Sequence, residues 1–202
     1  MGNFHEVLQW VMDANENLLL LGNSFHTPFL DWLMWTVTGK WIWAPLYFML
    51  AMLMFRRAGR EKSIICLAFI ALMILATDQT CATILRPAFK MLRPSSPDNP
   101  IYPMVQLING YHGGRYGFPS CHAANTFALA TFLSMVFRNR RATILLLSWS
   151  LIVSYSRIYL GVHYPGDIIG GFIVGGTYSI ICYKAAESVW QLLRHKIHRF
   201  AS

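Results

Sequence analysis

Long apolar segments separated by short polar connections constrain the fold of this chain more than any other feature. Each segment is close to the roughly 20 apolar residues that a helix needs to cross a bilayer. The segments cover residues 41–55, 63–85, 120–137, 142–159 and 167–186. We therefore predict an all-α, polytopic membrane helical bundle.

The composition supports a membrane protein. Hydrophobic residues make up 55% of the 202 residues and charged ones only 13%, whereas soluble domains carry about 25% charged residues. A net charge of +8 could suggest nucleic acid, but the basic residues gather between apolar segments, as the positive-inside rule requires. We predict one domain over residues 1–202, in contact with membrane lipid and not with nucleic acid. Its oligomeric state stays open.

Two segments near the N-terminus are less simple. Residues 1–25 alternate apolar and polar side chains near helical spacing, which predicts an amphipathic helix on the bilayer surface, too polar to span it. Residues 28–38 are apolar but short and contain Asp31, and they precede a break at Gly39-Lys40. Whether they cross the membrane stays open, so the bundle has five or six transmembrane helices.

Basic segments and polar clusters alternate along the chain. The basic segments are residues 56–62, 138–141 and 194–199, and the polar clusters are 86–94, 119–122 and 156–167. Because the intervening spans alternate in direction, the basic segments share one membrane side, expected to be cytoplasmic, and the polar clusters share the other. The connection at 86–118 is proline-rich and long, as functional loops often are, and we predict a stiff lid.

The polar clusters contain groups suited to phosphate chemistry. They are Arg86, Lys90, Arg93 and Arg157, with Ser120, His122, His163 and Asp167, and the connection at 86–118 adds Arg115 on the same side. There are too few acids for a magnesium or calcium site, and the cations would repel a zinc ion, so we expect no metal and no cofactor. The planar fork of arginine suits phosphate, and a serine at a helix N-terminus adds a hydroxyl and free N–H groups.

The histidines suggest covalent catalysis. His163 stands four residues before Asp167, and a carboxylate bonded to one imidazole nitrogen leaves the other free as a nucleophile. His122, from another span, could protonate the leaving oxygen and then activate water.

Some of the charged residues have a simpler interpretation. Arg86 and Lys90 could extend to the membrane interface, and Arg115 belongs to a solvated loop. Asp78 lies within an apolar segment, where a helix–helix hydrogen bond explains it better than catalysis.

The spacing of these residues resembles the three-part signature of the type 2 phosphatidic acid phosphatase (PAP2) superfamily of membrane lipid phosphatases. Here the signature reads Arg86 and Arg93-Pro94, then Pro119-Ser120-Cys121-His122, then Ser156-Arg157, His163 and Asp167. Arg86 replaces the usual lysine and Cys121 the usual glycine. The resemblance covers roughly residues 78–176.

The resemblance implies metal-independent hydrolysis of a phosphomonoester or pyrophosphate on a membrane lipid, through a phosphohistidine intermediate. His163 would be the nucleophile, Asp167 its orienting group and His122 the acid. Phosphate would be bound by Arg86, Arg93, Ser120 and Arg157. Likeness to bacterial members favours a lipid A phosphatase in the inner (cytoplasmic) membrane, with its site facing the periplasm. The alternatives are an undecaprenyl pyrophosphate, phosphatidylglycerophosphate or phosphatidic acid phosphatase, a lipid phosphotransferase, or a non-catalytic binder of lipid phosphates.

Overall fold

The computed structural model describes the backbone of residues 2–200 and the side chains of residues 5–195. Apart from one isolated bridge between Leu92 and Tyr116, regular structure in this part of the chain is helical. The helices are α1 (Gly2–Asn23), α2 (Pro28–Thr38), α3 (Ala44–Ala58), α4 (Arg60–Gln79), α5 (Arg86–Phe89), α6 (Cys121–Phe137), α7 (Arg140–Tyr159) and α8 (Pro165–Phe200). The prediction of an all-α fold is confirmed.

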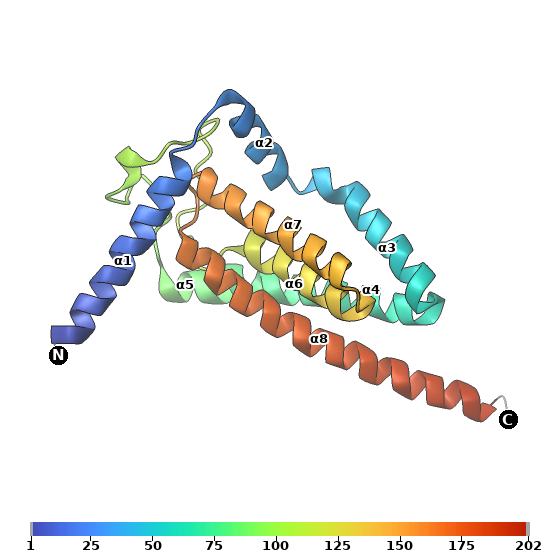
Figure 1. Cartoon of the computed structure of the whole chain (residues 1–202). Coiled ribbons are helices and arrows are strands. Elements are labelled where there is room, and N and C mark those ends of the chain that lie inside the picture. The colour runs from blue at the N-terminus through green and yellow to red at the C-terminus, as the bar shows by residue number, and fades with distance from the viewer. Residues whose placement is uncertain (1, 201–202) are drawn as a thin grey trace.

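A bundle of α4, α6, α7 and α8 forms the body of the molecule, and α6 packs against the other three (Figure 1). The glycines of α8 allow its close contact with α6. A Cβ atom at Gly171 would lie 2.7 Å from the carbonyl oxygen of Ser120, and one at Gly175 would meet the backbone of Ala124. The small glycine residues therefore let the two helices approach closely.

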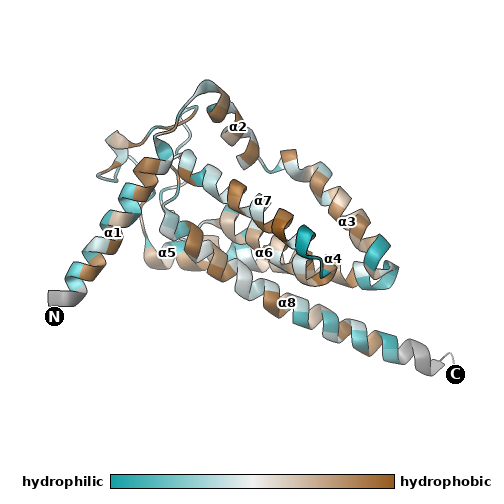
Figure 2. Ribbon diagram, viewed as in Figure 1, coloured by the Kyte–Doolittle hydropathy of each residue, from teal (hydrophilic) through white to brown (hydrophobic). Residues whose placement is uncertain are grey.

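Three helical stretches of the described chain are long and apolar enough to cross a membrane: Arg60–Phe89, Arg140–Tyr159 and Pro165–His195. A fourth candidate combines α2 with the stretch Trp41–Ala58, but the two are bent by 74° at the break. The prediction of a break at Gly39-Lys40 is thus confirmed. At 17 residues α6 is shorter, although it lies inside the bundle (Figure 2). The number of spans stays a prediction.

We expected the basic segment at residues 56–62 to form a loop between two helices, and this prediction is wrong. α3 ends at Ala58 and α4 begins at Arg60, so only Gly59 separates them, with φ of +81°. Glycine adopts this conformation at little cost, and arginine and lysine are good helix formers. The last helix also continues beyond the predicted end near residue 186, to Phe200.

α1 extends away from the bundle and exposes much of its apolar surface, including Trp10 (Figure 1). Its C-terminal end is anchored: Leu19 is fully buried, and the amide of Asn23 donates to the carbonyl oxygens of Tyr159 and Gln106, over 2.7 and 2.9 Å. A helix with this pattern is suited to a bilayer surface, which stays a prediction.

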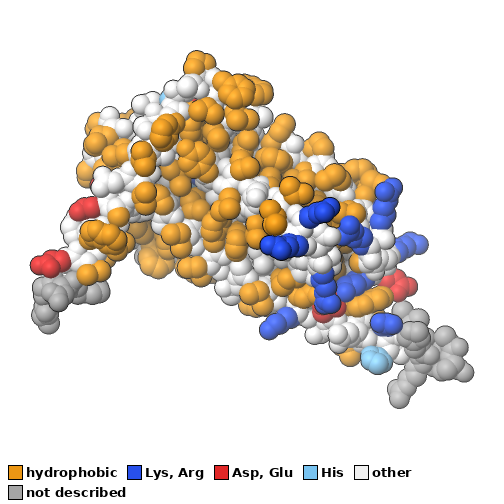
Figure 3. Space-filling model, viewed as in Figure 1, with side chains coloured by type: hydrophobic (Ala, Val, Ile, Leu, Met, Phe, Trp, Pro, Cys, Tyr) orange, Lys and Arg blue, Asp and Glu red, His pale blue; other side chains and the backbone are white. Residues whose placement is uncertain are grey.

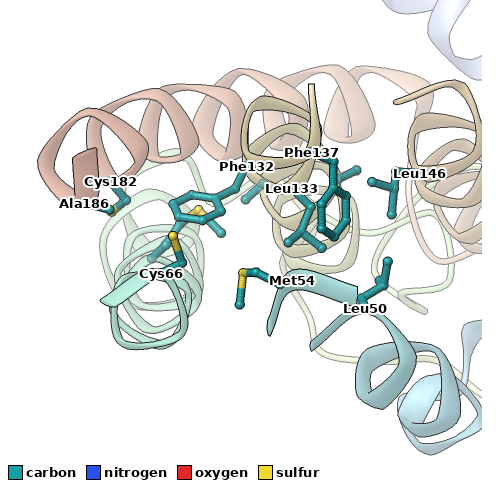
Figure 4. Packing of buried hydrophobic residues seen from close by; sticks show 12 residues of the cluster. Leu50, Met54, Cys66, Phe132, Leu133, Phe137, Leu146, Cys182 and Ala186 are labelled. Atoms are coloured by element: carbon teal, nitrogen blue, oxygen red, sulfur yellow. The ribbon is translucent and has the colours of Figure 1, made fainter. Parts of the chain in front are cut away.

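The main apolar core lies between α3, α4, α6, α7 and α8 (Figure 4). Met54, Phe132 and Leu133 meet there, and Cys66 and Cys182 pack among them as small hydrophobic side chains. Lysine and arginine side chains gather at the end of the bundle where α3 meets α4 and α6 meets α7 (Figure 3). This basic end is opposite to the end where α6 begins.

Candidate active site

Antiparallel packing brings the three polar clusters to one end of the bundle. α5, the last turn of α7 and the first turns of α6 and α8 meet there, at the end that carries the connection at 86–118 (Figure 1). Each cluster is adjacent to a helix terminus, where the chain offers free backbone groups.

His163 and Asp167 form a buried pair at the start of α8. Nδ1 of His163 lies 3.0 Å from Oδ2 of Asp167, and the two residues are 1% and 2% exposed. The same carboxylate oxygen accepts a hydrogen bond from the backbone N–H of Tyr164, over 3.0 Å. Gly117 lies against it, since a Cβ there would be 2.9 Å from Oδ2. The carboxylate is therefore fixed, and it fixes the imidazole.

Arg93 determines which nitrogen of His163 carries the proton. Its Nη1 lies 2.8 Å from Nε2 of His163. Because a guanidinium can only donate, Nε2 must accept, and the proton resides on Nδ1, facing Asp167. Burial, reinforced by the charge of Arg93, lowers the pKa of His163 well below its usual value. The imidazole is therefore neutral, with a lone pair on Nε2.

The backbone holds the Arg93 side chain. Nη1 also donates to the carbonyl oxygen of Val162, over 3.0 Å, and Nε to that of Tyr116, over 3.1 Å. Arg93 is 4% exposed. Burial, together with the charges of Arg86 and Arg157, lowers its pKa to about 10. Crowding three guanidinium groups in a buried place is costly unless an anion offsets them.

Arg157 approaches this place from the end of α7, and Arg86 from the start of α5. Arg157 donates through Nη1 to Oγ1 of Thr38 over 2.5 Å, and its guanidinium lies 5.5 Å from the ring centroid of Tyr111. Arg86 donates to the carbonyl oxygen of Pro119, over 3.4 Å. Within the described side chains, Nε of both arginines is buried without a hydrogen-bond partner. Donors therefore remain for a bound anion.

Ser120 begins α6 and links it to α8. Its Oγ accepts from the backbone N–H of Ala123 over 3.5 Å, as predicted for an N-cap. Its own N–H donates to the carbonyl oxygen of Asp167, over 3.0 Å. His122 follows in the first turn of α6, half-buried beside the arginines.

A cavity of about 680 Å³ opens at this cluster. Arg86, Arg93, His122 and Arg157 line its polar end. The cavity then continues between α3, α4, α6 and α7, where its lining is mostly apolar. Residues there include Leu50, Met54, Ile70, Ile74, Leu129 and Leu133. His163 is not part of this lining, but Arg93, which is, contacts its Nε2.

The remaining charged residues that the sequence singled out have other surroundings. Lys90 is exposed, and Arg115 forms an exposed ion pair with Asp98 over 3.1 Å. Asp78 accepts a hydrogen bond from Nδ2 of Asn125 in α6, over 3.2 Å, which confirms the predicted helix–helix contact.

Three residues near the site were not predicted: Thr38, Lys40 and Tyr111. The break at Gly39-Lys40 was visible in the sequence, but nothing there indicated which side chains face the arginines. The isolated Lys40 at this break was the feature of the sequence that could have indicated them.

Comparison with known proteins gives a consistent result. Residues 64–190 match the PAP2 superfamily. The chain is 44% identical over 183 residues to a lipid A 4'-phosphatase of Bacteroides thetaiotaomicron, covering 91% of this chain and 81% of that protein. It is 34% identical over 187 residues to a lipid A 4'-phosphatase of Porphyromonas gingivalis, covering 91% and 78%.

A solved structure has the same fold. The PAP2 type phosphatidylglycerolphosphate phosphatase from Bacillus subtilis superposes with a TM-score of 0.62 at 21% identity, over 89% of this chain and 87% of that one. This likeness concerns the fold alone, and it agrees with a multi-pass membrane protein. The matched family region and the two similar relatives show that the chain belongs to the PAP2 superfamily.

Proposed function

We propose that the protein is a lipid A 4'-phosphatase, which removes one phosphate from lipid A without a metal ion. The observation that carries the proposal is the cavity itself. Its polar end holds three arginines and a histidine, and its apolar part runs between the helices. A ligand that fits both parts has a phosphorylated headgroup and an acyl chain.

The substrate choice is supported by the relatives. Two proteins named lipid A 4'-phosphatase align with 91% of this chain, so the likeness includes the segments around the cavity as well as the signature. Lipid diphosphate hydrolysis and phosphate transfer to another lipid use the same groups. They are outcomes that the assay below separates.

In the proposed mechanism the phosphoryl oxygens bind to Arg86, Arg93 and Arg157, with Ser120 at the N-terminus of α6. Arg93 covers Nε2 of His163 in the structure. Its guanidinium therefore turns toward the phosphoryl oxygens when the substrate binds, and this frees the lone pair of Nε2.

The reaction then has two steps. When the phosphate anion binds, it offsets the arginine charges and His122 takes up a proton. In the first step, Nε2 of His163 forms a bond to phosphorus while the bond from phosphorus to the sugar oxygen breaks, and His122 gives its proton to that oxygen. In the second, His122 takes a proton from water, the hydroxide oxygen bonds to phosphorus, and the N–P bond breaks. Asp167 keeps Nδ1 protonated and stabilises the imidazolium. The arginines stabilise the charge on the transferring group.

We place the site at the periplasmic face of the inner membrane. The support is the position of the lysines and arginines at the opposite end of the bundle (Figure 3), which the positive-inside rule assigns to the cytoplasm. In this proposal residues 1–202 act as one domain, residues 1–25 lie in the interface, and residues 86–118 cover the site.

The test is phosphate release by the purified protein in EDTA, with lipid A, undecaprenyl pyrophosphate and phosphatidylglycerophosphate as substrates. His163→Ala removes the nucleophile, and His195→Ala, at the exposed far end of α8, is the matched control. We expect release from the 4'-position of lipid A, lost in His163→Ala and kept in His195→Ala. Release that persists in His163→Ala would contradict the mechanism, and exclusive transfer of phosphate to a lipid acceptor would contradict hydrolysis.

A further inference from the structure

The bend between α2 and α3 forms one wall of the cavity. We call Thr38, Gly39 and Lys40 the elbow; all three line the cavity together with Arg86, Arg157 and His122. The elbow lies outside the three-part signature, and it is distant in the sequence from the residues of that signature. Its place at the polar end of the cavity therefore needs its own explanation.

The elbow is attached to the cation cluster. Thr38 accepts a hydrogen bond from Arg157, over 2.5 Å. Before Thr38 in α2, Trp35 packs edge-on against Tyr111, with 5.7 Å between the ring centroids. Tyr111 in turn lies under Arg157. These contacts hold the next residues, Gly39 and Lys40, beside the site.

Lys40 is exposed and adds a charge at the mouth of the cavity that has no acidic partner among the described side chains. No carboxylate of the described side chains lies within ion-pair distance of it. It lines the polar end of the cavity together with Arg86 and Tyr111, so it lies beside the cluster. The carboxylate of Asp78 also lines the cavity, but it accepts a hydrogen bond from Asn125 on another wall.

The charges around the cavity exceed what one phosphate can offset. The described lining contains the cations Lys40, Arg86, Arg93 and Arg157 and one carboxylate, Asp78. A phosphomonoester carries about −1.5 to −2 charges near neutral pH, and the three arginines alone suffice for it. Lys40, which is exposed, would then remain available for a second anion in the complex.

We infer that the elbow is a second anion-binding subsite, in which Lys40 binds a further phosphate of the headgroup beside the phosphoryl group that is hydrolysed. This inference rests on the proposed function and predicts that the protein prefers lipids with two phosphates. A lysine suits the role because its ammonium is a compact charge on a flexible stem and needs no fixed geometry.

Two kinds of lipid can supply the second phosphate. Lipid A with a phosphate on each sugar supplies a distant one, and a lipid diphosphate supplies an adjacent one. The test therefore compares two matched pairs: bisphosphorylated with 4'-monophosphorylated lipid A, and undecaprenyl diphosphate with undecaprenyl monophosphate. The variant is Lys40→Met, which keeps the length and apolar stem of the side chain. Lys90→Met, an exposed lysine of the connection outside the cavity lining, is the control.

We expect Lys40→Met to lower kcat/KM about tenfold for the two-phosphate lipid of one pair, as for loss of a charge-assisted hydrogen bond, and less than about twofold for its one-phosphate partner. The affected pair identifies the source of the second phosphate. Lys40→Arg should recover most of the loss, and Lys90→Met should change neither member.

An equal change in both members of each pair, or no change in either, would overturn the inference while wild-type turnover keeps the proposed function intact. A wild-type protein that hydrolyses no lipid of the panel would instead overturn the proposed function. The thermal unfolding midpoint of each variant shows whether it is folded, and Lys40→Arg gives a second, milder test at the same position.

Discussion

The two ends of the bundle are both rich in cations but hold them differently. At the site end Arg93 and Arg157 are 4% and 2% exposed, and each is fixed by two or more groups. At the basic end Arg138 is exposed and reaches Tyr183 over 3.3 Å, and Lys62 pairs with Glu187. Exposed cations are worth little to stability, whereas buried ones are costly unless they are compensated.

This difference separates two uses of the same residue types. The exposed cations suit a membrane surface, where their number matters and their geometry does not. The buried cations are held by hydrogen bonds in fixed directions, which suits recognition of one anion in one orientation. Substitutions of matched residues at the two ends test whether this difference in geometry affects activity and stability.

The largest effect should come from Asp167→Asn. The amide keeps the size of the side chain but no longer fixes the Nδ1–H tautomer of His163, and the comparable change in serine proteases lowers turnover about 10⁴-fold. We expect a fall in kcat of about 10³- to 10⁴-fold, measured as phosphate release from lipid A. Glu187→Gln, at the basic end, is the matched control. A loss of less than about tenfold would show that the carboxylate does not orient the nucleophile.

A smaller effect is expected for Arg157→Met, paired with Arg138→Met. Removing one preorganised donor to a developing charge costs about 10²- to 10³-fold in kcat. Arg138→Met should stay within about twofold of the wild type, because that side chain is exposed far from the cavity. Single-turnover phosphate release compares the two. Similar losses in both variants would mean that net charge, and not position, matters.

The packing of α6 on α8 should be sensitive at the site end. Gly171→Ala places a Cβ 2.7 Å from the carbonyl oxygen of Ser120, so the helices must move apart, and overpacking of this kind costs about 1–3 kcal/mol. Gly176→Ala meets only the ring of Phe127, at 3.4 Å, and should be nearly neutral. Unfolding midpoints in one detergent test this. Equal midpoints for the two variants would contradict the close contact.

The pH dependence of stability should give the smallest effect. Burial lowers the pKa of His163, so between its folded value and about 6.5 the unfolded chain binds a proton that the folded chain does not. The contribution of His163 is fully present above pH 6.5 and is lost as the pH falls, by up to about 1.4 kcal/mol per pH unit.

The free energy of unfolding of the wild type, minus that of His163→Gln, should therefore decrease between pH 7 and pH 5. A flat difference for His163→Gln would contradict its burial as a neutral imidazole.

The sequence was sufficient to predict some parts of this account. His163 and Asp167 are one turn apart at the start of a helix, so local geometry alone brings them together. Ser120 follows the rules of helix capping. That Arg93 and Arg157 reach the same place follows from antiparallel spans, a property of membrane topology that short loops impose.

Other features depend on tertiary contacts that no local pattern encodes. Thr38 and Tyr111 meet Arg157 only because α2 bends back over the end of α7. Arg93 lies over Nε2 of His163 because the carbonyl oxygens of Val162 and Tyr116 hold it there. The helix break at Gly59 was mistaken for a loop, since a cluster of basic residues looks the same in either structure.

The central claim is that Nε2 of His163 attacks phosphorus. The most direct measurement is mass spectrometry of the protein quenched in alkali during turnover of lipid A, because phosphohistidine survives alkali. We expect phosphate on His163 in the wild type, none in His163→Ala, and none in wild type incubated without substrate. Rapid turnover with no phosphate on His163, or with phosphate on another residue, would contradict the account.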